Sequence, residues 1–598
     1  MLSFSSEVKA SDYIAQFLVE QGVKHTFGIT GGCIVHTLDS LAKRDDIKHI
    51  PVKHEQAAAM AADAYSRVTN NIGVALTTSG PGATNLLTGT CCSYYDSIPI
   101  ISITGQVPTG QLKRDSKSRQ IGFQETDVAN IFKFVTKYSS LVDTPDTLRY
   151  ELEKAAYLAR SGRPGPVLID ICDDIQRADI NPENLKSFTP PAEEVSSQDL
   201  EARIQQSLDL IKNSKRPVVI LGGGIRAGGA IEKAKYFVNK LGFPVAPTWG
   251  AMDYIPYDHP LMVGSFGVSS ERAGNFVVQN SDLVIALGTR LDTHEIGPNA
   301  KTFARGAKKI VLDIDESELD KYKKLGLEVD VPICEDINRF FDKINPQLKD
   351  FEKIDLREWF NYVERVKTKY PICLPEYADQ TENVNPYVFM RELSRQSGND
   401  DVILSDCGGN LIWTMQGLHL RGNQRLISAF NHSPMGYSFP ASIGAAFGTK
   451  NPITCITGDG GFEMNIQELA TIQYNKLPVR IFVMNNHGHG IIKQTLRTWL
   501  KGNYTGVDSK TGLADVDFEA VANAYKIPSL RISNHSELSG KIEETLNHTG
   551  PVLCNVQIAP EQEMLPKLVF GRPIEDSAPL LSRQEFNDNM LVPPIEKP

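Results

Sequence analysis

The sequence lacks any run of the roughly 20 apolar residues that a membrane-spanning helix needs, so we expect no membrane segment. It also lacks a cluster of Lys and Arg, and its formal net charge is −10, which argues against a nucleic-acid partner. The N-terminal stretch has no basic segment followed by an apolar run. We therefore expect no signal peptide and a cytoplasmic location.

Two cysteine and glycine patterns are absent as well. The nine cysteines are scattered and include no Cys-x-x-Cys pair, which disfavours a zinc site or a disulfide framework and favours buried free thiols. No GxGxxG fingerprint is present, and this disfavours an oxidoreductase that uses a nicotinamide or a flavin.

What the chain does contain is a repeated alternation of apolar strands and amphipathic helices. Its 598 residues, 41% hydrophobic and 22% charged, are typical of several globular domains. The alternation predicts an α/β fold with three doubly wound parallel-sheet domains. We divide the chain into an N-terminal domain (1–185), a linker (186–205), a central domain (206–350), a linker helix (351–384), a third domain (385–560) and a C-terminal tail (561–598). The tail is expected either to pack over the domains or to act as a lid.

One segment, GDGGFEMNIQELATIQYNKLPVRIFVMNN (458–486), points to an anion site. An apolar strand precedes it and three glycines allow a tight turn. The apolar spacing then predicts a helix with Phe462 and Ile472 on its buried face, followed by a second buried strand. Backbone N–H groups at such a turn and helix start bind phosphate.

The acid within this turn predicts a metal. Asp459 would repel a phosphate unless a cation lay between them, and Asn486 adds an amide carbonyl at the end of the next strand. With a backbone carbonyl and phosphate oxygens, these groups form the all-oxygen ligand set that suits Mg²⁺. We therefore expect a diphosphate that is held through Mg²⁺.

Residues 74–105 repeat the same order of strand, glycine loop, helix, proline turn and strand. Each glycine loop follows another marked helix, since Glu55 precedes Gly80 by 25 residues and Met435 precedes Gly458 by 23 residues. The first half carries Glu55, whereas the second carries the acid and the amide described above. We infer that the first half contributes the reacting group and that the second half anchors the ligand.

Taken together, these motifs resemble those of thiamine diphosphate (ThDP) enzymes, whose diphosphate and metal motif matches GDG at 458–460 and NN at 485–486. HEQAAAMAADAYSR, TTSGPGATNLLTG, DSIPIISITGQVP and MGYSFPASIGAAFG resemble segments of the catalytic subunit of acetohydroxyacid (acetolactate) synthases, in the same order and over nearly the whole chain. The resemblance implies a pyrimidine-binding first domain, a central domain and a diphosphate-binding third domain.

The resemblance also implies roles for individual residues. Asp459, Asn486 and the backbone carbonyl of Gly488 are expected to bind Mg²⁺, while Met435 and the Ser433 carbonyl are expected to support the bent cofactor. The other expected cofactor-binding positions are Gly31, Gly32, Pro81, Gly409, Asn410, Gly458, Gly460, Gly461 and Gly490.

By the same resemblance, Glu55 reaches the pyrimidine N1′ from the first domain of a partner subunit. The minimal unit is then a homodimer, and a homotetramer is also expected in this family. A carboxyl group in an apolar pocket can share a proton with a ring nitrogen, which helps the cofactor to lose its C2 proton. The alternative is that Glu55 is a carboxylate at a helix start, stabilised by the helix dipole.

Two further catalytic candidates are Gln124, as a hydrogen-bond partner of the reacting groups, and His489, as a proton donor. The expected substrate-pocket residues are Thr30, Phe123, His487, Ile491 and Thr495. The alternative interpretations are a loop glutamine without a role, solvated loop histidines, and a plain strand-to-helix turn at 29–32.

The chain departs from the synthase pattern near the acceptor. Thr495 stands where synthases carry a tryptophan, Gly409-Asn410 replace the usual Gln-His, and Thr30 replaces a proline. We predict that the enzyme decarboxylates pyruvate or a related 2-oxo acid and passes the two-carbon unit to a carbonyl acceptor. The alternatives are a keto sugar or aldehyde as acceptor, a simple decarboxylase or lyase, and a noncatalytic homologue. The sequence does not identify a regulatory subunit.

The central domain matches a synthase domain that binds a structural FAD, although other relatives have kept this fold and lost the flavin. Our candidate FAD positions are Gly222, Gly223, Gly224, Arg290 and Asp313. Glycines at strand ends are also common turns, so the alternative is a central domain without FAD.

Overall fold

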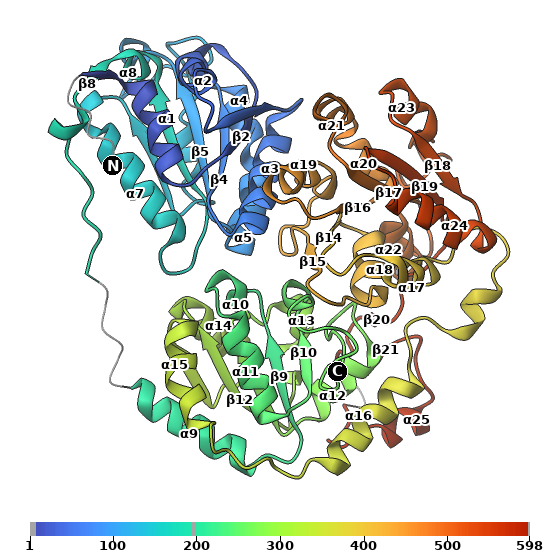
Figure 1. Cartoon of the computed structure of the whole chain (residues 1–598). Coiled ribbons are helices and arrows are strands. Elements are labelled where there is room, and N and C mark those ends of the chain that lie inside the picture. Colours follow the sequence, from blue (N-terminus) through green and yellow to red (C-terminus); the bar gives the residue numbers. More distant parts are fainter. Residues whose placement is uncertain (1–6, 193–198, 596–598) are drawn as a thin grey trace.

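The computed structural model describes residues 7–192 and 199–595, so part of the predicted linker at 186–205 lies outside the described residues. Three parallel sheets occupy separate parts of the chain, coloured blue, green and orange in Figure 1. The first sheet has the order β3-β2-β4-β5-β7-β6. Its strands are β2 (His25–Gly28), β3 (Lys48–Pro51), β4 (Gly73–Thr77), β5 (Ile100–Gln106), β6 (Tyr138–Val142) and β7 (Val167–Cys172).

The central sheet has the order β10-β9-β11-β12-β13. Its strands are β9 (Pro217–Leu221), β10 (Val245–Pro247), β11 (Leu283–Leu287), β12 (Lys308–Asp313) and β13 (Val331–Cys334). The third sheet has the order β15-β14-β16-β17-β19-β18. Its strands are β14 (Val402–Ser405), β15 (Arg425–Ile427), β16 (Ile453–Gly458), β17 (Val479–Asn485), β18 (Ser529–Ile532) and β19 (Val552–Gln557).

The first and third sheets share one topology. Numbered within its own domain, each has the strand order 2-1-3-4-6-5, and all pairs are parallel. Helices cover both faces, so strands such as β4 and β11 are apolar and buried along their whole length. The predicted fold class, with three doubly wound parallel sheets, is confirmed.

Short loops connect the helices to the strands of each domain. The helices of the first domain are α1 (Ala10–Glu20), α2 (Val35–Ala42), α3 (Glu55–Thr69), α4 (Pro81–Asn85), α5 (Leu87–Asp96), α6 (Val128–Phe132), α7 (Leu148–Arg160) and α8 (Asp173–Arg177). Those of the central part are α9 (Leu200–Asn213), α10 (Gly224–Ala227), α11 (Ile231–Leu241), α12 (Arg272–Asn280), α13 (Thr293–Ile296), α14 (Glu316–Leu325), α15 (Ile337–Gln347) and α16 (Arg357–Lys369). Those of the third domain are α17 (Pro386–Gln396), α18 (Gly409–Gly417), α19 (Ser438–Gly448), α20 (Asp459–Glu463), α21 (Leu469–Asn475), α22 (Gly490–Leu500), α23 (Phe518–Ala524) and α24 (His535–Leu546).

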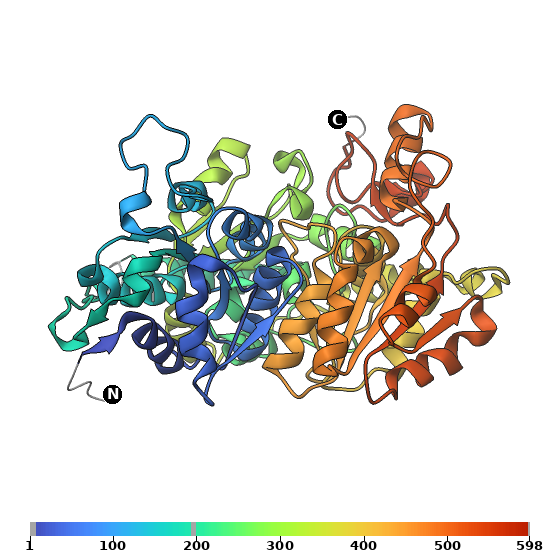
Figure 2. The same ribbon diagram turned by 90° about the horizontal axis from the view of Figure 1, so that it is seen from above.

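Helices α3 and α19 join the first and third domains, and Figure 2 shows these two domains side by side with the green central domain behind them. The joint is closely packed, because a Cβ at Gly444 would lie only 1.8 Å from the carbonyl oxygen of Ala61. The alanine-rich face of α3 is fully buried there and belongs to a core that the two domains share. Glycine and alanine at these positions let the two backbones touch.

The single helix that we predicted from Phe462 to Ile472 is wrong. The chain instead forms α20, a short 3-10 turn at Ile466–Glu468 and α21. The break lies at Asn465, whose Nδ2 donates a hydrogen bond to the carbonyl of Gly436 at 2.7 Å. The apolar side chains at both ends remain buried, so the predicted buried face survives the break.

The segments predicted as linker helix and tail pack on the central domain. Helix α16 buries Trp359 and Val363 in the central core. The tail contains β20 (Lys567–Leu568), β21 (Ser577–Ala578) and α25 (Arg583–Asp588), and its buried Glu575 accepts hydrogen bonds from Gln279 and Arg305. The tail therefore packs over the domains, while our exact domain boundaries stay predictions. Within 7–192 and 199–595, no helix has both the length and the apolar composition that crossing a membrane requires.

Candidate active site

All three sheets reverse their strand order beside their first strand, which lies between the second and the third. In open α/β sheets, ligands bind outside the carboxyl ends of the strands at such a point. Gly31 and Gly32 follow the first strand β2, and Gly222 follows the first strand β9. Gly458 to Gly461 lie at the end of β16, the third strand of its domain, which pairs with the first strand β14. Each domain thus has one such switch point, and the predicted groups are distributed among the three.

Asp459 begins α20 and is only 7% exposed. Its Oδ1 accepts the backbone N–H of Gly460 at 2.7 Å, and its Oδ2 accepts that of Gly488 at 2.8 Å. Burial raises the pKa of Asp459, and these two N–H groups act in the opposite direction. The carboxylate is therefore fixed between the turn after β16 and the loop after β17.

The loop after β17 is built for close approach. Gly488 has φ = 140°, and a Cβ there would lie 2.1 Å from the carbonyl oxygen of Val507. A Cβ at Gly490 would lie 2.2 Å from Nδ2 of Asn486, which is itself buried. Only glycine fits at 488, and a side chain at 490 would displace the Asn486 amide, which is confined beside the turn that carries Asp459.

These groups could hold a divalent cation with help from a ligand. Among the described residues, no group of three or more His, Cys, Asp or Glu side chains forms a metal site. The predicted set contains a single carboxylate, from Asp459, with the Asn486 amide and the Gly488 carbonyl. Its remaining ligands would be phosphate oxygens, which is how Mg²⁺ is commonly bound with nucleotides and diphosphates.

Gly460 marks the floor of this site. A Cβ at Gly460 would lie 2.9 Å from Nε2 of His489 and 3.0 Å from Cε of Met435, so the turn, the histidine and the methionine converge there. A Cβ at Gly458 would lie 3.1 Å from Oδ1 of Asn410. The structure thus brings together five of the residues predicted from distant parts of the third domain: Asn410, Met435, Gly458, Gly460 and His489.

Asp406, which sequence reasoning missed, organises this cluster. It follows β14, is fully buried, and accepts hydrogen bonds from the backbone N–H of Gly436 at 3.0 Å and from Oγ1 of Thr457 at 3.0 Å. Burial raises its pKa to about 6, against the lowering effect of these donors. It fixes the end of the loop that carries Met435 and Ser433. The sequence does contain a signal for Asp406, since an acidic residue directly follows an apolar strand.

The first-domain candidates gather around Glu55. Glu55 begins α3, is 9% exposed, and its Oε2 accepts a hydrogen bond from Nδ2 of Asn85 at 2.9 Å. A Cβ at Gly82 would lie 3.4 Å from its Oε1, and a Cβ at Gly80 would lie 2.7 Å from the carbonyl oxygen of Gln124. The hydrogen bond of Glu55 stays within its own domain.

The remaining candidates of the first domain are more open. Pro81 is the first residue of α4 and is exposed, as are Thr30 and Gly32. Phe123 is 83% exposed, next to Gln124 at φ = 63°. These residues are therefore accessible from solvent.

The substrate-pocket candidates of the third domain separate into two groups. Ile491 and Thr495 lie on α22, where the Thr495 hydroxyl donates a hydrogen bond to the Ile491 carbonyl at 2.9 Å. His487 is turned toward the neighbouring chain segments, with Nδ1 3.1 Å from Asp515 and Nε2 3.1 Å from Gln557. Of the two histidines, His489 is the one that the structure brings to Gly460.

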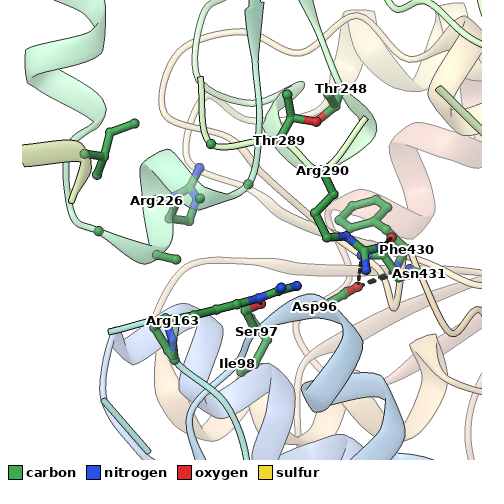
Figure 3. Close-up of a pocket in the computed structure, with 18 of the residues that line it drawn as sticks. Asp96, Ser97, Ile98, Arg163, Arg226, Thr248, Thr289, Arg290, Phe430 and Asn431 are labelled. Carbon is green, nitrogen blue, oxygen red and sulfur yellow. Dashed lines mark hydrogen bonds between the residues drawn. The ribbon is translucent and has the colours of Figure 1, made fainter. Parts of the chain in front are cut away.

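A cavity of about 330 Å³ lies where the three domains meet (Figure 3). Four of the five candidate FAD positions line it: Gly223, Gly224, Arg290 and Asp313. Gly222 does not line the cavity, because it packs against the segment that follows β11. A Cβ at Gly222 would lie 2.2 Å from the carbonyl oxygen of Gly288.

The cavity wall is rich in guanidinium groups: of the five arginines that line it, the sequence predicted only Arg290. Figure 3 shows Arg163 from the first domain and Arg226 and Arg290 from the central domain around it. Arg163 pairs with Asp315 at 3.0 Å, and Arg226 pairs with Asp253 at 2.7 Å. Arg163 comes from another domain, so no local pattern could place it here.

Other groups on the wall suit a polar ligand. Nε1 of Trp249 is buried without a hydrogen-bond partner, and no atom lies within 4 Å of a Cβ built at Gly223. Burial raises the pKa of Asp313 to about 6 and that of Glu295 to about 8. These donors, glycines and arginines fit the diphosphate and ribose of a nucleotide such as FAD.

Family models match most of the chain. The "Thiamine pyrophosphate enzyme, N-terminal TPP binding domain" covers residues 8–131, the central domain of the same family covers 204–344, and the C-terminal TPP binding domain covers 406–556. The chain belongs to the thiamine pyrophosphate enzyme family. Thiamine pyrophosphate is another name for ThDP, so the resemblance is confirmed and ThDP is the cofactor of this enzyme.

Relatives within the thiamine pyrophosphate enzymes include three acetolactate synthases. Acetolactate synthase 2, chloroplastic, of Nicotiana tabacum is 32% identical over 578 residues, which is 95% of this chain and 85% of that protein. The acetolactate synthase isozyme 1 large subunit of Escherichia coli is 31% identical over 562 residues, 94% and 96% of the two chains. The acetolactate synthase large subunit of Lactococcus lactis is 31% identical over 574 residues, 95% and 96%. The cytoplasmic location stays a prediction, as do the individual residue roles.

Proposed function

We propose that this thiamine pyrophosphate enzyme is a carboligase that decarboxylates pyruvate or a related 2-oxo acid and transfers the two-carbon unit to a carbonyl acceptor. The observation that carries this proposal is the convergence of Asp459, Met435 and His489 around Gly460 at the crevice of the third sheet. The similarity to acetolactate synthases over most of the chain supports the reaction class.

In this proposal the third domain anchors the cofactor. Asp459, Asn486 and the carbonyl of Gly488 hold Mg²⁺, and the backbone N–H groups of Gly460 and its neighbours receive the diphosphate. Met435 lies over the floor of the site and supports the bent form of the cofactor. When bound, ThDP supplies the electron sink that decarboxylation needs.

The first domain supplies the acid. Glu55 is nearly buried, and the Asn85 amide orients its carboxyl group. There it can exchange a proton with N1′ of the pyrimidine. By the similarity to acetolactate synthases, the site is completed by the first domain of a second copy in a homodimer or homotetramer. Gln124 and His489 then serve as hydrogen-bond partner and proton donor to the reacting groups.

The acceptor pocket is wider than a tryptophan at position 495 would allow. Thr495 is a small side chain on α22, and its hydroxyl is already bonded to the helix backbone. A second 2-oxo acid remains our first acceptor, and the small side chain favours a bulkier carbonyl compound such as a keto sugar as the second.

We also propose that the central cavity binds FAD or a related nucleotide. Arg163, Arg226 and Arg290 supply positive charge for its diphosphate, and Gly223 after β9 leaves room for it. Purified protein that carries a yellow chromophore, released on denaturation, would establish the flavin. A colourless protein that retains an adenine nucleotide would establish the related nucleotide.

The reaction is tested with purified protein, ThDP, Mg²⁺ and pyruvate, with the products identified. We expect CO₂ release with formation of a ligated product, loss of activity when EDTA removes the metal, and a fall in kcat of roughly 10²–10⁴-fold in Glu55→Gln with ThDP still bound. Glu352→Gln, an exposed glutamate, is the control. CO₂ release with acetaldehyde alone would identify a decarboxylase instead.

A further inference from the structure

Asn431 lies where all three domains meet, on the loop 428–437 between β15 and α19. Its Nδ2 donates a hydrogen bond to Oδ1 of Asp96 in the first domain at 2.6 Å. Its Oδ1 accepts a hydrogen bond from the Arg290 guanidinium of the central domain, and Figure 3 shows both interactions beside the cavity. One side chain therefore connects a third-domain loop to both other domains.

Asp96 holds the start of this loop. As the last residue of α5, it accepts the backbone N–H of Phe430 at 3.0 Å and that of Asn431 at 3.1 Å, in addition to the Asn431 side chain. Its side chain is only 4% exposed, and Arg67 pairs with Oδ2 at 2.8 Å. A carboxylate with charged and backbone partners in a buried position is confined to one orientation.

The end of the same loop is held by a second carboxylate, because Asp406 accepts the backbone N–H of Gly436. Only residues 432–435 lie between the two anchors. They include Ser433, which has φ = 49°, and Met435, whose Cε would be 3.0 Å from a Cβ at Gly460. The short span leaves little freedom in where these two residues lie.

We propose that Asp96 and Asn431 form a clamp that positions Ser433 and Met435 for ThDP, and that Arg290 extends this clamp to the wall of the central cavity. The inference rests on the proposed function, because it concerns the loop that supports the cofactor. Asp96 and Asn431 are positioning residues, since they act through the loop. The clamp makes the affinity for ThDP depend on contacts from two other domains.

The experiment measures the Kd for ThDP at saturating Mg²⁺ by quenching of intrinsic fluorescence, together with kcat and the apparent KM for ThDP. Asn431→Ala is expected to raise the Kd and the apparent KM about tenfold, because it removes hydrogen bonds to two charged groups, and to leave kcat at saturating ThDP within about twofold. Arg290→Ala removes only one of these bonds, so about a threefold rise is expected. A general loss of structure would lower kcat and the thermal midpoint instead.

The matched control is Asn423→Ala, an exposed asparagine on the turn before β15 whose side chain bonds Asp400. It should leave the Kd for ThDP unchanged. Wild-type binding with an unchanged Kd in Asn431→Ala would overturn the clamp and leave the proposed function intact. Wild-type protein that fails to bind ThDP would overturn both. Should Asn431→Ala not fold, Asn431→Asp takes its place, because it keeps an oxygen for Arg290 and loses the donor to Asp96; an unchanged Kd in that variant would overturn the clamp.

Discussion

Glu468 of the third domain binds the backbone of His54 in the first. Its Oε1 accepts the N–H groups of Lys53 at 2.8 Å and of His54 at 3.1 Å, and its Oε2 accepts the Thr471 hydroxyl at 2.7 Å. The next residue along the chain is Glu55. The fully buried Glu468 carboxylate, whose pKa is raised by burial, therefore fixes the entry to the helix that presents the proposed catalytic acid.

Removing this contact should misplace Glu55. Glu468→Ala leaves two backbone N–H groups without their acceptor. Each group that no water molecule reaches lowers the free energy of unfolding by about 1–3 kcal/mol. We expect kcat to fall about tenfold or more, with little change in the Kd for ThDP. Glu468→Gln keeps a carbonyl oxygen for both N–H groups and should retain most activity. Equal losses in both variants would show that charge, rather than position, is what matters.

The width of the acceptor pocket can be changed at one position. Thr495→Trp should raise the KM for a bulky carbonyl acceptor by at least tenfold and leave the reaction with a small 2-oxo acid nearly unchanged, because a large ring fills space that the threonine leaves open. Product ratios from mixed acceptors measure this. Thr498→Trp, one turn further along α22 and exposed, is the control. The same ratio in all three proteins would place the pocket elsewhere.

The close packing between α3 and α19 predicts that one added methyl group at Gly444 strongly lowers the stability of the protein. Gly444→Ala puts a Cβ within 1.8 Å of the Ala61 carbonyl, so the two backbones must move apart. We expect a loss of about 3 kcal/mol or more, since backbone cannot adapt as a side chain does. Gly540→Ala in α24 has no atom within 4 Å of its Cβ and should stabilise its helix by about 0.5–1 kcal/mol. Thermal midpoints of both variants test this difference in sign.

Glu271 predicts a pH dependence of stability. It lies buried in the central domain, where its oxygens accept hydrogen bonds from the Ser265 N–H at 3.1 Å and the Tyr257 hydroxyl at 2.9 Å. Burial raises its pKa from 4.5 to about 7. Between these values the folded state keeps a proton that the unfolded state has lost. The free energy of unfolding therefore has its full contribution from Glu271 below pH 4.5. This contribution falls by about 3 kcal/mol in all as the pH rises to about 7.

Glu271→Gln should remove this slope, because its amide can accept from Ser265 and donate to the tyrosine oxygen. At pH 5 the variant should be about as stable as the wild type, and at pH 8 it should be more stable. Thermal midpoints across this range measure the difference, with the exposed Glu352→Gln as control. Parallel curves for wild type and Glu271→Gln would contradict the prediction.

The fold could be predicted because its signals are local. Apolar strands, the glycine turn at 458–461 and the helix that begins at Glu55 are each encoded within a few neighbouring residues. The cofactor site could be predicted for the same reason, since Asp459 and Asn486 directly follow two adjacent strands, and parallel strands bring their carboxyl ends to one edge.

What the sequence could not supply depends on contacts between distant segments. The helix break at Asn465 needs the carbonyl of Gly436 from another loop. Arg163 reaches the cavity from a different domain than the glycines it faces. The tail has little periodicity, and its place over α12 follows from single hydrogen bonds such as that between Asn275 and the Ile574 carbonyl. None of these partners is visible in a local pattern.

The contact of Gly444 with Ala61 also bears on motion. Surfaces that touch through their backbones have no rotamers to exchange, so the first and third domains are expected to move as one rigid body. We expect opening for substrate to occur in segments whose contacts run through at least one side chain rather than from backbone to backbone. Helix α22 and the tail meet in this way, through Arg497 with Glu563 and through the rings of Trp499 and Phe570 at 5.9 Å. Side-chain contacts of this kind break and re-form without disturbing the joint beneath them.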